Sequence, residues 1–316
     1  MTPTLSILIP TRNAAAYLPD WQRALELQRG APVYEVIAID SGSSDGTPEL
    51  LERAGVGVMR IAPEEFGHGK TRNLGLAACQ GELVLLTVQD ALPQGPGFLA
   101  NVISPFLQDT RIAAVRARQV PPADARPAVR WRCERAPAFA AQPQRYELAP
   151  GERLEDLPAA TALQHCGLDF VATCIRREVW KRLALPEQPF AEDRAWAARI
   201  LGDGLAWVHA PAATVIHAHD RRPGYTFRRR YLEQRSRQAL LGSDPSLQGR
   251  PLVRAALGSL ELARAAPWFL PRSQGAAAAA GELASAAADL WAGEAGALLA
   301  RADAVMGKEW RWVGEV

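Results

Sequence analysis

Short apolar runs alternate with helical patterns along the first half of the chain. Strands are expected over residues 5–9, 33–39, 57–61, 83–87 and 112–117, and helices over 15–28, 48–53, 71–79 and 98–107. Strands that alternate with helices in this way are typical of an α/β fold with a parallel sheet. The predicted fold class is therefore α/β with a mostly parallel central sheet.

The second half of the chain changes character twice. Residues 120–165 are rich in proline, alanine and arginine and show little periodicity, which predicts a long irregular insertion. An ordered segment is expected over 168–174, helices over 178–183 and 193–201, and two closing strands over 205–208 and 213–216. Arginines, and then alanine and leucine at helical spacing, predict a helical region broken at Pro267 and Pro271. We expect a first domain over 1–224 and a helical C-terminal region over 225–316.

Net charge, cysteine spacing and the lengths of the apolar runs exclude some classes of protein. The 316 residues carry a net charge of +2, which argues against general nucleic-acid binding. The four cysteines lack metal-ligand spacing such as C-x-x-C, so reduced thiols in a cytosolic protein are expected. The first apolar run is too short for a signal peptide, and no segment approaches the roughly 20 apolar residues of a membrane-spanning helix. We expect a soluble cytoplasmic protein, with contact to the inner face of the membrane left open.

The most informative motif, V-I-A-I-D-S-G-S-S-D-G-T at 36–47, is an apolar strand that stops at an aspartate and a polar loop. Asp40 ends the strand, and open α/β sheets bind ligands at the carboxyl ends of their strands. Glycine lets the backbone approach a ligand and short polar side chains can bind it; the candidates are Ser41, Gly42, Ser43 and Asp45. An ordinary strand-to-helix connection capped by Asp45 or Thr47 is the alternative.

A second motif, I-P-T-R-N at 9–13, ends the first predicted strand. It offers Thr11 and Asn13 as hydrogen-bonding groups and Arg12 as a cation. An ordinary helix cap explains the same residues equally well.

Two further motifs open predicted helices. F-G-H-G-K-T-R-N at 66–73 places His68, Lys70 and Arg72 near a helix N-terminus. The helix dipole disfavours cations there unless an anion is bound, so a phosphate is a natural partner and a solvated basic turn is the alternative. A-E-D-R at 191–194 puts Glu192 and Asp193 where an acceptor can sit, although acidic residues also occur in first turns merely to satisfy the dipole.

The candidate metal ligands come from two strand ends. Asp90, in V-Q-D-A at 88–91, follows a buried strand and should enter the same crevice as Asp40. A single carboxylate there suits a divalent metal that keeps water and phosphate ligands. His217 and His219, in V-I-H-A-H at 215–219, lie two residues apart and point to one side, so one of them can add a ligand. A helix cap at Asp90 and ordinary surface or core histidines are the alternatives.

Taken in chain order, these six motifs resemble glycosyltransferase family 2, and most of all its rhamnosyltransferase-like bacterial branch, over roughly residues 4–240. The resemblance implies a GT-A fold and inverting transfer of a sugar from a UDP-, dTDP- or GDP-linked donor. The acceptor would be a hydroxyl of a glycan or lipid-linked molecule, in bacterial surface polysaccharide synthesis, with 120–165 on the acceptor side. It also implies Mg²⁺ or Mn²⁺ as cofactor. The alternative is a nucleotide-sugar-binding subunit or scaffold that has lost catalysis.

The resemblance assigns roles to individual residues. Asp40 would bind the edge of the base and Asp193 would be the general base. Asp90 would be the remaining acid of the family's Asp-x-Asp metal motif, with His217 or His219 as a second metal contact. The other predicted substrate-binding residues are Pro10, Thr11, Arg12, Asn13, Ser41, Gly42, Ser43, Asp45, His68, Lys70, Arg72, Gln89 and Glu192.

Two positions depart from the family pattern. Gln89 stands where the first acid of Asp-x-Asp is expected, and Asp169-Phe170 stands where members of the branch often carry Ser-Asn near the transferred sugar. The sugar therefore does not follow from the resemblance. The basic run at 221–237 suits a donor diphosphate, a lipid pyrophosphate, an anionic membrane face or a solvated helix. The tail tryptophans Trp268, Trp291, Trp310 and Trp312 suit a core, an interface or a membrane surface, and the oligomeric state is left open.

Overall fold

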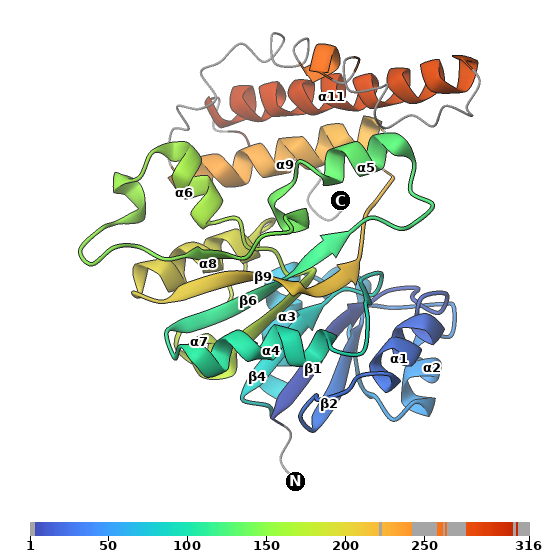
Figure 1. Ribbon diagram of the computed structural model, residues 1–316, viewed down its shortest axis with the longest axis vertical. Coiled ribbons are helices and arrows are strands. Elements are labelled where there is room, and N and C mark those ends of the chain that lie inside the picture. Colours follow the sequence, from blue (N-terminus) through green and yellow to red (C-terminus); the bar gives the residue numbers. More distant parts are fainter. Residues whose placement is uncertain are drawn as a thin grey trace.

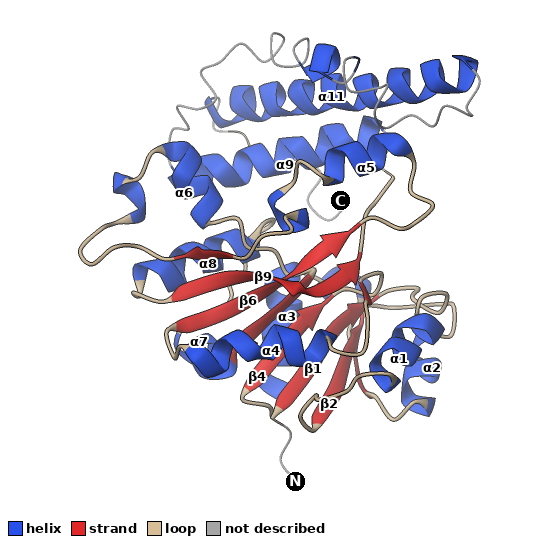
Figure 2. Ribbon diagram, in the orientation of Figure 1, coloured by secondary structure: helices blue, strands red, loops and turns tan. Residues whose placement is uncertain are grey.

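The computed structural model describes residues 4–220, 223–241, 258–261, 263, 276–305 and 308. Within these ranges nine strands form one sheet, in the order β3-β2-β1-β4-β8-β6-β9-β5, with β7 beside β9 (Figure 2). The strands are β1 Leu5–Thr11, β2 Tyr34–Asp40, β3 Gly57–Arg60, β4 Leu83–Thr87, β5 Leu92–Pro93, β6 Ile112–Val120, β7 Gln144–Tyr146, β8 Ala172–Arg176 and β9 Ala206–Ile216. The predicted α/β class is confirmed.

Helices flank the sheet, and two long ones lie beyond it (Figure 1). The α-helices are α1 Leu18–Glu26, α2 Thr47–Arg53, α3 His68–Ala78, α4 Phe98–Gln108, α5 Pro127–Cys133, α6 Ala159–His165, α7 Arg177–Arg182, α8 Glu192–Gly202, α9 Pro223–Leu241 and α11 Ala276–Val305. Single 3₁₀ turns lie at η1 Pro63–Glu65, η2 Pro137–Phe139 and η3 Leu154–Asp156.

The direction of the strands decides where a site can form. Strands β3, β2, β1 and β4 run parallel, as expected. Strand β8 runs antiparallel to both β4 and β6, and β6 is parallel to β9. The carboxyl ends of β1, β2, β4, β6 and β9 therefore share one edge of the sheet, which the start of β8 joins.

Both faces of the sheet are buried, which explains the nearly continuous apolar runs in the sequence. Ile7 of β1 belongs to the core formed with α1 and α4, and Leu8 to the core formed with α3 and α8. Successive side chains of a strand point to opposite faces, so each central strand must be apolar on both sides. This requirement made β1, β2 and β4 readable from the sequence.

Two expectations about the second half are wrong in detail. The two closing strands form one strand, β9, whose pairing with β6 jumps from Ala210 opposite Ala117 to Thr214 opposite Arg118. Residues 211–213, which begin with Pro211, bulge out of the ladder; proline lacks the N–H that a ladder needs. The 120–165 insertion contains α5, α6 and β7, and β7 pairs with β9, so it is ordered by tertiary contacts rather than by its own periodicity.

Helix α9 carries most of the basic run and lies between α11 and the sheet (Figure 1). A Cβ on Gly296 of α11 would lie 2.1 Å from the carbonyl oxygen of Phe227, so the two helices approach closely only because residue 296 is glycine. Tyr231 donates a hydrogen bond to Asp303 at 3.0 Å, and Arg229 and Arg230 both pair with Glu233. Of the four interpretations left open for the basic run, the simple solvated helix face is therefore wrong for this part of α9.

Several residues singled out in the tail are not placed. Pro267, Pro271, Trp268, Trp310, Trp312 and residues 221–222 lie outside the described residues. Trp291 lies on α11 with 43% of its surface exposed. Among the described helices, none combines the length and apolar composition needed to cross a bilayer.

Candidate functional site

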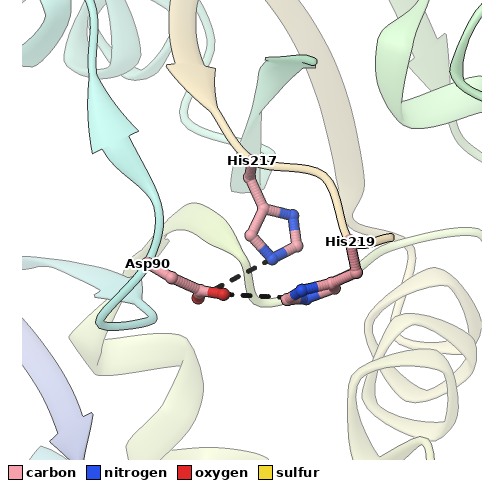
Figure 3. Close-up of side chains that lie close together, drawn as sticks. All are labelled: Asp90, His217 and His219. Atoms are coloured by element: carbon pink, nitrogen blue, oxygen red, sulfur yellow. Dashed lines mark ion pairs between the residues drawn. The ribbon is translucent and has the colours of Figure 1, made fainter. Parts of the chain in front are cut away.

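Asp90, His217 and His219 form one cluster, although Asp90 and His217 are 127 positions apart in the sequence. His217 Nε2 lies 3.8 Å from Asp90 Oδ1, and His219 Nε2 lies 3.7 Å from Asp90 Oδ2 (Figure 3). Each residue offers one ligand atom, and these three atoms all lie within 4.8 Å of one another, close enough to hold a metal ion. Two imidazoles with one carboxylate suit Mn²⁺ better than Mg²⁺, which prefers oxygen ligands.

Asp40 lies at the end of β2 with 2% of its surface exposed. Its carboxylate accepts hydrogen bonds from the backbone N–H groups of Gly42, at 3.1 Å, and Ser43, at 2.9 Å. The hydroxyls of Thr11, at 3.2 Å, and Ser43 also donate to it. Asp40 therefore shapes the loop that follows it, in addition to the base contact that the resemblance implies.

The loops after β1 and β2 are joined to each other. Asn13 accepts a hydrogen bond from the backbone of Ser44 at 2.9 Å, and its own N–H donates to the Ser43 hydroxyl at 2.8 Å. Asp45 accepts hydrogen bonds from the N–H of Thr47, at 3.1 Å, and from the N–H of Ala15, at 2.9 Å. The N-cap of α2 itself is Gly46, without a side-chain cap, so neither Asp45 nor Thr47 caps the helix. Pro10 and Ser41 flank these contacts, at the ends of β1 and β2.

Gly42 is required for steric reasons. Its φ of +83° lies in the left-handed region, and a Cβ there would approach Pro63 Cγ to 2.6 Å. A residue with a side chain would therefore be strained and would collide with the next loop.

Gln89 is used differently from an acid of an Asp-x-Asp motif. Its Oε1 accepts from the backbone N–H of Arg12 at 2.8 Å, and its Nε2 donates to the carbonyl of Arg12 at 3.1 Å. The amide thus joins the loop after β4 to the loop after β1. A carboxylate cannot make both bonds, because it only accepts.

The expected cluster of three positive charges at the start of α3 is wrong. Arg72 forms a buried ion pair with Glu192, which neutralises both and joins α3 to α8. Burial, and then the charge of Arg72, lower the pKa of His68, so this imidazole is neutral at pH 7. Lys70 remains exposed and lines a pocket of about 400 Å³ with Ile61 and Glu187.

Asp193 lies in the first turn of α8, at the same edge of the sheet. Burial raises the pKa of its carboxyl group to about 7, and the nearby charges of Glu192 and Asp169 act in the same direction. Its position follows from Ala191, whose φ of 62° is left-handed and which turns the chain into the helix. A carboxyl group that titrates near neutral pH can accept a proton in a reaction.

Three residues that the sequence did not single out as ligands connect these parts. Gln119, at the end of β6, hydrogen-bonds His217 Nδ1 at 2.9 Å and Asp169 Oδ1 at 3.0 Å. Asp169 also lies 3.7 Å from Arg116, a fully buried arginine that donates to the carbonyl of Gly167 at 2.5 Å. No local pattern marks Gln119 or Arg116, because both are polar residues inside a strand whose partners are distant in sequence.

The predicted residues therefore meet along one edge. Thr11 links Asp40 to β1, Gln89 links β1 to the loop that carries Asp90, and the histidines link Asp90 to β9. Asp193 is linked to them electrostatically, because the charge of Asp169 contributes to its raised pKa.

Comparison with known proteins identifies the family. The family model described as Glycosyl transferase family 2 matches residues 6–152. The chain is 30% identical over 236 residues to the O-antigen chain rhamnosyltransferase WbaN of Salmonella anatum, covering 72% of this chain and 70% of that protein. The chain belongs to glycosyltransferase family 2.

Further relatives agree with this assignment. This family 2 glycosyltransferase is 30% identical over 234 residues to the O-antigen chain rhamnosyltransferase RfbN of Salmonella typhimurium, covering 71% of the chain and 69% of that protein. Its fold is similar to that of the mannosyltransferase PcManGT of Pyrobaculum calidifontis, with a TM-score of 0.58, 21% identity, and coverage of 98% of this chain and 89% of that one. The GT-A fold expected from the motifs is confirmed.

Proposed function

We propose that this glycosyltransferase moves a sugar from a nucleoside diphosphate sugar to a hydroxyl of a glycan or lipid-linked acceptor, with inversion, in bacterial surface polysaccharide synthesis. The observation that carries the proposal is the pairing of a cluster able to hold a metal ion with a carboxyl group of raised pKa along one edge of the sheet. The Salmonella relatives are O-antigen chain rhamnosyltransferases, which supports the polysaccharide context and makes rhamnose the first sugar to test.

Asp90, His217 and His219 are the residues that would hold the metal ion. A divalent ion held there would stabilise the charge that develops on the departing diphosphate. PcManGT was solved with GDP-Man and Mn²⁺, which supports Mn²⁺ for this chain, as does the pair of imidazoles in the cluster.

Asp193 would take the proton from the acceptor hydroxyl. The hydroxyl oxygen then attacks C1 of the sugar as the bond from C1 to the diphosphate oxygen breaks, and the proton moves to a carboxylate oxygen of Asp193. One displacement from the opposite face inverts the anomeric centre. The raised pKa suits this task, because a base is most effective when its pKa lies near the working pH.

The loops after β1 and β2 would bind the nucleoside. Asp40, Thr11 and Ser43 form one hydrogen-bonded unit, so their side chains are held in place without a bound nucleotide. Lys70 is the exposed cation of the α3 motif and is the first candidate for a contact with the diphosphate.

The test is release of nucleoside diphosphate from a panel of UDP-, GDP- and dTDP-linked sugars, rhamnose included, with Mn²⁺. We expect one nucleotide to be preferred and Asp193→Asn to lose at least roughly 10²-fold in rate while binding the donor normally. The matched control is Asp203→Asn at the other end of α8, which should keep its activity. Near-normal turnover of Asp193→Asn would show that another group is the base, and a wild-type protein that binds donor but never turns over would favour the scaffold alternative.

A further inference from the structure

Gln119 lies between two residues that belong to different parts of the site. It is the penultimate residue of β6, and 6% of its surface is exposed. Its side-chain oxygen lies 2.9 Å from His217 Nδ1, and its side-chain nitrogen lies 3.0 Å from Asp169 Oδ1. A buried amide with one partner on each side joins the two groups physically.

Asp169 determines which way this amide points. The Asp169 carboxylate also receives the backbone N–H of Val171 at 3.2 Å and lies 3.7 Å from the guanidinium of Arg116. Both neighbours only donate, so Asp169 acts as an acceptor. The amide of Gln119 must therefore turn its NH₂ group toward Asp169, since the opposite orientation would bring two acceptors together.

The orientation of the amide in turn determines the tautomer of His217. With its NH₂ group facing Asp169, Gln119 presents its oxygen to His217 Nδ1. An amide oxygen only accepts, so the proton of the neutral imidazole must lie on Nδ1. The lone pair is left on Nε2, the atom that lies 3.8 Å from Asp90 Oδ1 and in the position of a metal ligand.

We propose that Gln119 is a positioning residue that holds His217 ready to bind the metal ion and makes this readiness depend on Asp169. The inference builds on the metal site of the proposed function. Partners of this kind orient a ligating imidazole, and their loss typically costs about 10- to 100-fold in metal affinity. The metal site and the segment before β8 are thereby coupled through a single amide.

Three variants separate this role from a purely structural one. Gln119→Leu removes both hydrogen bonds. Gln119→Glu keeps an acceptor for His217 Nδ1 but loses the donor toward Asp169. Asp169→Asn removes the requirement that orients the amide, since an asparagine can pair with either end of Gln119. Gln94→Leu, an exposed glutamine beside β5, is the matched control.

The first measurement is the affinity for Mn²⁺ without donor, from the electron paramagnetic resonance of the free ion. We expect Gln119→Leu to bind about tenfold more weakly, Gln119→Glu to stay within about threefold of wild type, and the control to be unchanged. Asp169→Asn should weaken binding in the wild-type background but not once Gln119 is glutamate, because the asparagine NH₂ then donates to the carboxylate at position 119. Equal affinity in Gln119→Leu and wild type would overturn the proposal.

The second measurement does not depend on the metal. The ¹⁵N chemical shifts of labelled histidine at pH 8, with His217 assigned by its loss in His217→Ala, report which ring nitrogen carries the proton. We expect the proton on Nδ1 in wild type and Gln119→Glu, and on both nitrogens in exchange in Gln119→Leu. If wild type binds no Mn²⁺ at all, the metal chemistry proposed above fails, while a proton confined to Nδ1 in wild type and shared between both nitrogens in Gln119→Leu still supports the role of Gln119. An unchanged tautomer in that variant, confirmed as folded by its thermal transition, would refute it.

Discussion

Gln89 hydrogen-bonds both backbone groups of Arg12, accepting from its N–H at 2.8 Å and donating to its carbonyl at 3.1 Å. Restoring an acid at this position should therefore harm the protein. In Gln89→Glu one bond is lost and a carboxylate faces the carbonyl of Arg12, which we expect to cost about 1 kcal/mol of unfolding free energy. Urea denaturation measures this, and Gln80→Glu, at an exposed position in the loop after α3, is the control. A gain in Mn²⁺ affinity without loss of stability would contradict this interpretation.

The pH dependence of turnover should follow Asp193. Burial raises the pKa of its carboxyl group to about 7, and only the ionised form can accept a proton. We expect kcat/KM to rise with pH and level off above about 7, and this limb to be absent from any residual activity of Asp193→Asn. A profile that is flat between pH 5 and 8 would exclude Asp193 as the base.

The same shift predicts a pH-dependent effect on stability. The pKa of Asp193 is raised on folding, so its contribution is present below the unfolded value of 3.8 and is lost as pH rises through about 7. Asp193→Asn should thus be more stable than wild type, and by a wider margin at pH 8 than at pH 5. Thermal melts at the two pH values test this. An equal difference in stability at the two pH values would mean that burial does not raise the pKa of Asp193.

The buried pair of Arg72 and Glu192 should be costly to break from one side. Arg72→Met leaves the Glu192 carboxylate buried without its partner, and we expect a loss of about 3–5 kcal/mol. Replacing both, as Arg72→Met with Glu192→Gln, should recover most of it. Chemical denaturation of the four proteins of this double-mutant cycle gives the coupling. Additive losses would show that the two charges do not depend on each other.

Ala191 holds a left-handed conformation that suits glycine better. Ala191→Gly should raise stability by about 1 kcal/mol, because the strain at this position disappears. Ala195→Gly, in the interior of α8, is the matched control and should lower stability by about 1 kcal/mol. Melting temperatures distinguish the two. A loss in both variants would indicate that position 191 carries no strain.

Substitutions in the cluster of Asp90, His217 and His219 should lower the Mn²⁺ affinity to different degrees. Asp90→Asn removes the only carboxylate that the cluster contains and should abolish Mn²⁺ binding, whereas His219→Ala keeps Asp90 and His217 and should weaken it. Chelation of wild type should stop nucleotide release, and added Mn²⁺ should restore it. Isothermal titration with Mn²⁺ checks the binding, with Asp124→Asn on the exposed insertion as control. Full activity after chelation would remove the metal from the mechanism.

The parts of the site that could be predicted follow from local rules. Strands β1, β2 and β4 are buried on both faces, so they appear in the sequence as apolar runs, and Asp40 and Asp90 appear as the polar residues that end them. The helix starts at His68 and Glu192 were close to the predicted ones for the same reason. These features depend on residues within a few positions of each other.

Other features depend on residues far apart in the chain. Arg72 and Glu192 are 120 positions apart, and their pairing places Arg72 in a neutral contact between helices, so that of the two formal cations in the expected anion site Lys70 alone is exposed. Gln119 lies 50 positions from Asp169 and 98 from His217, so nothing near Gln119 indicates its two partners. The order of the strands brings these residues together.

The chain by itself thus determined the α/β class, the family and the identity of the polar residues at the strand ends, because burial and turn chemistry leave local patterns. Tertiary structure decided which of those residues meet, which charges cancel and which carboxyl group is forced to a pKa near 7. The physical reason is that hydrogen bonding and desolvation act between neighbours in space, and the sheet order that sets those neighbours is not visible in any short stretch of sequence.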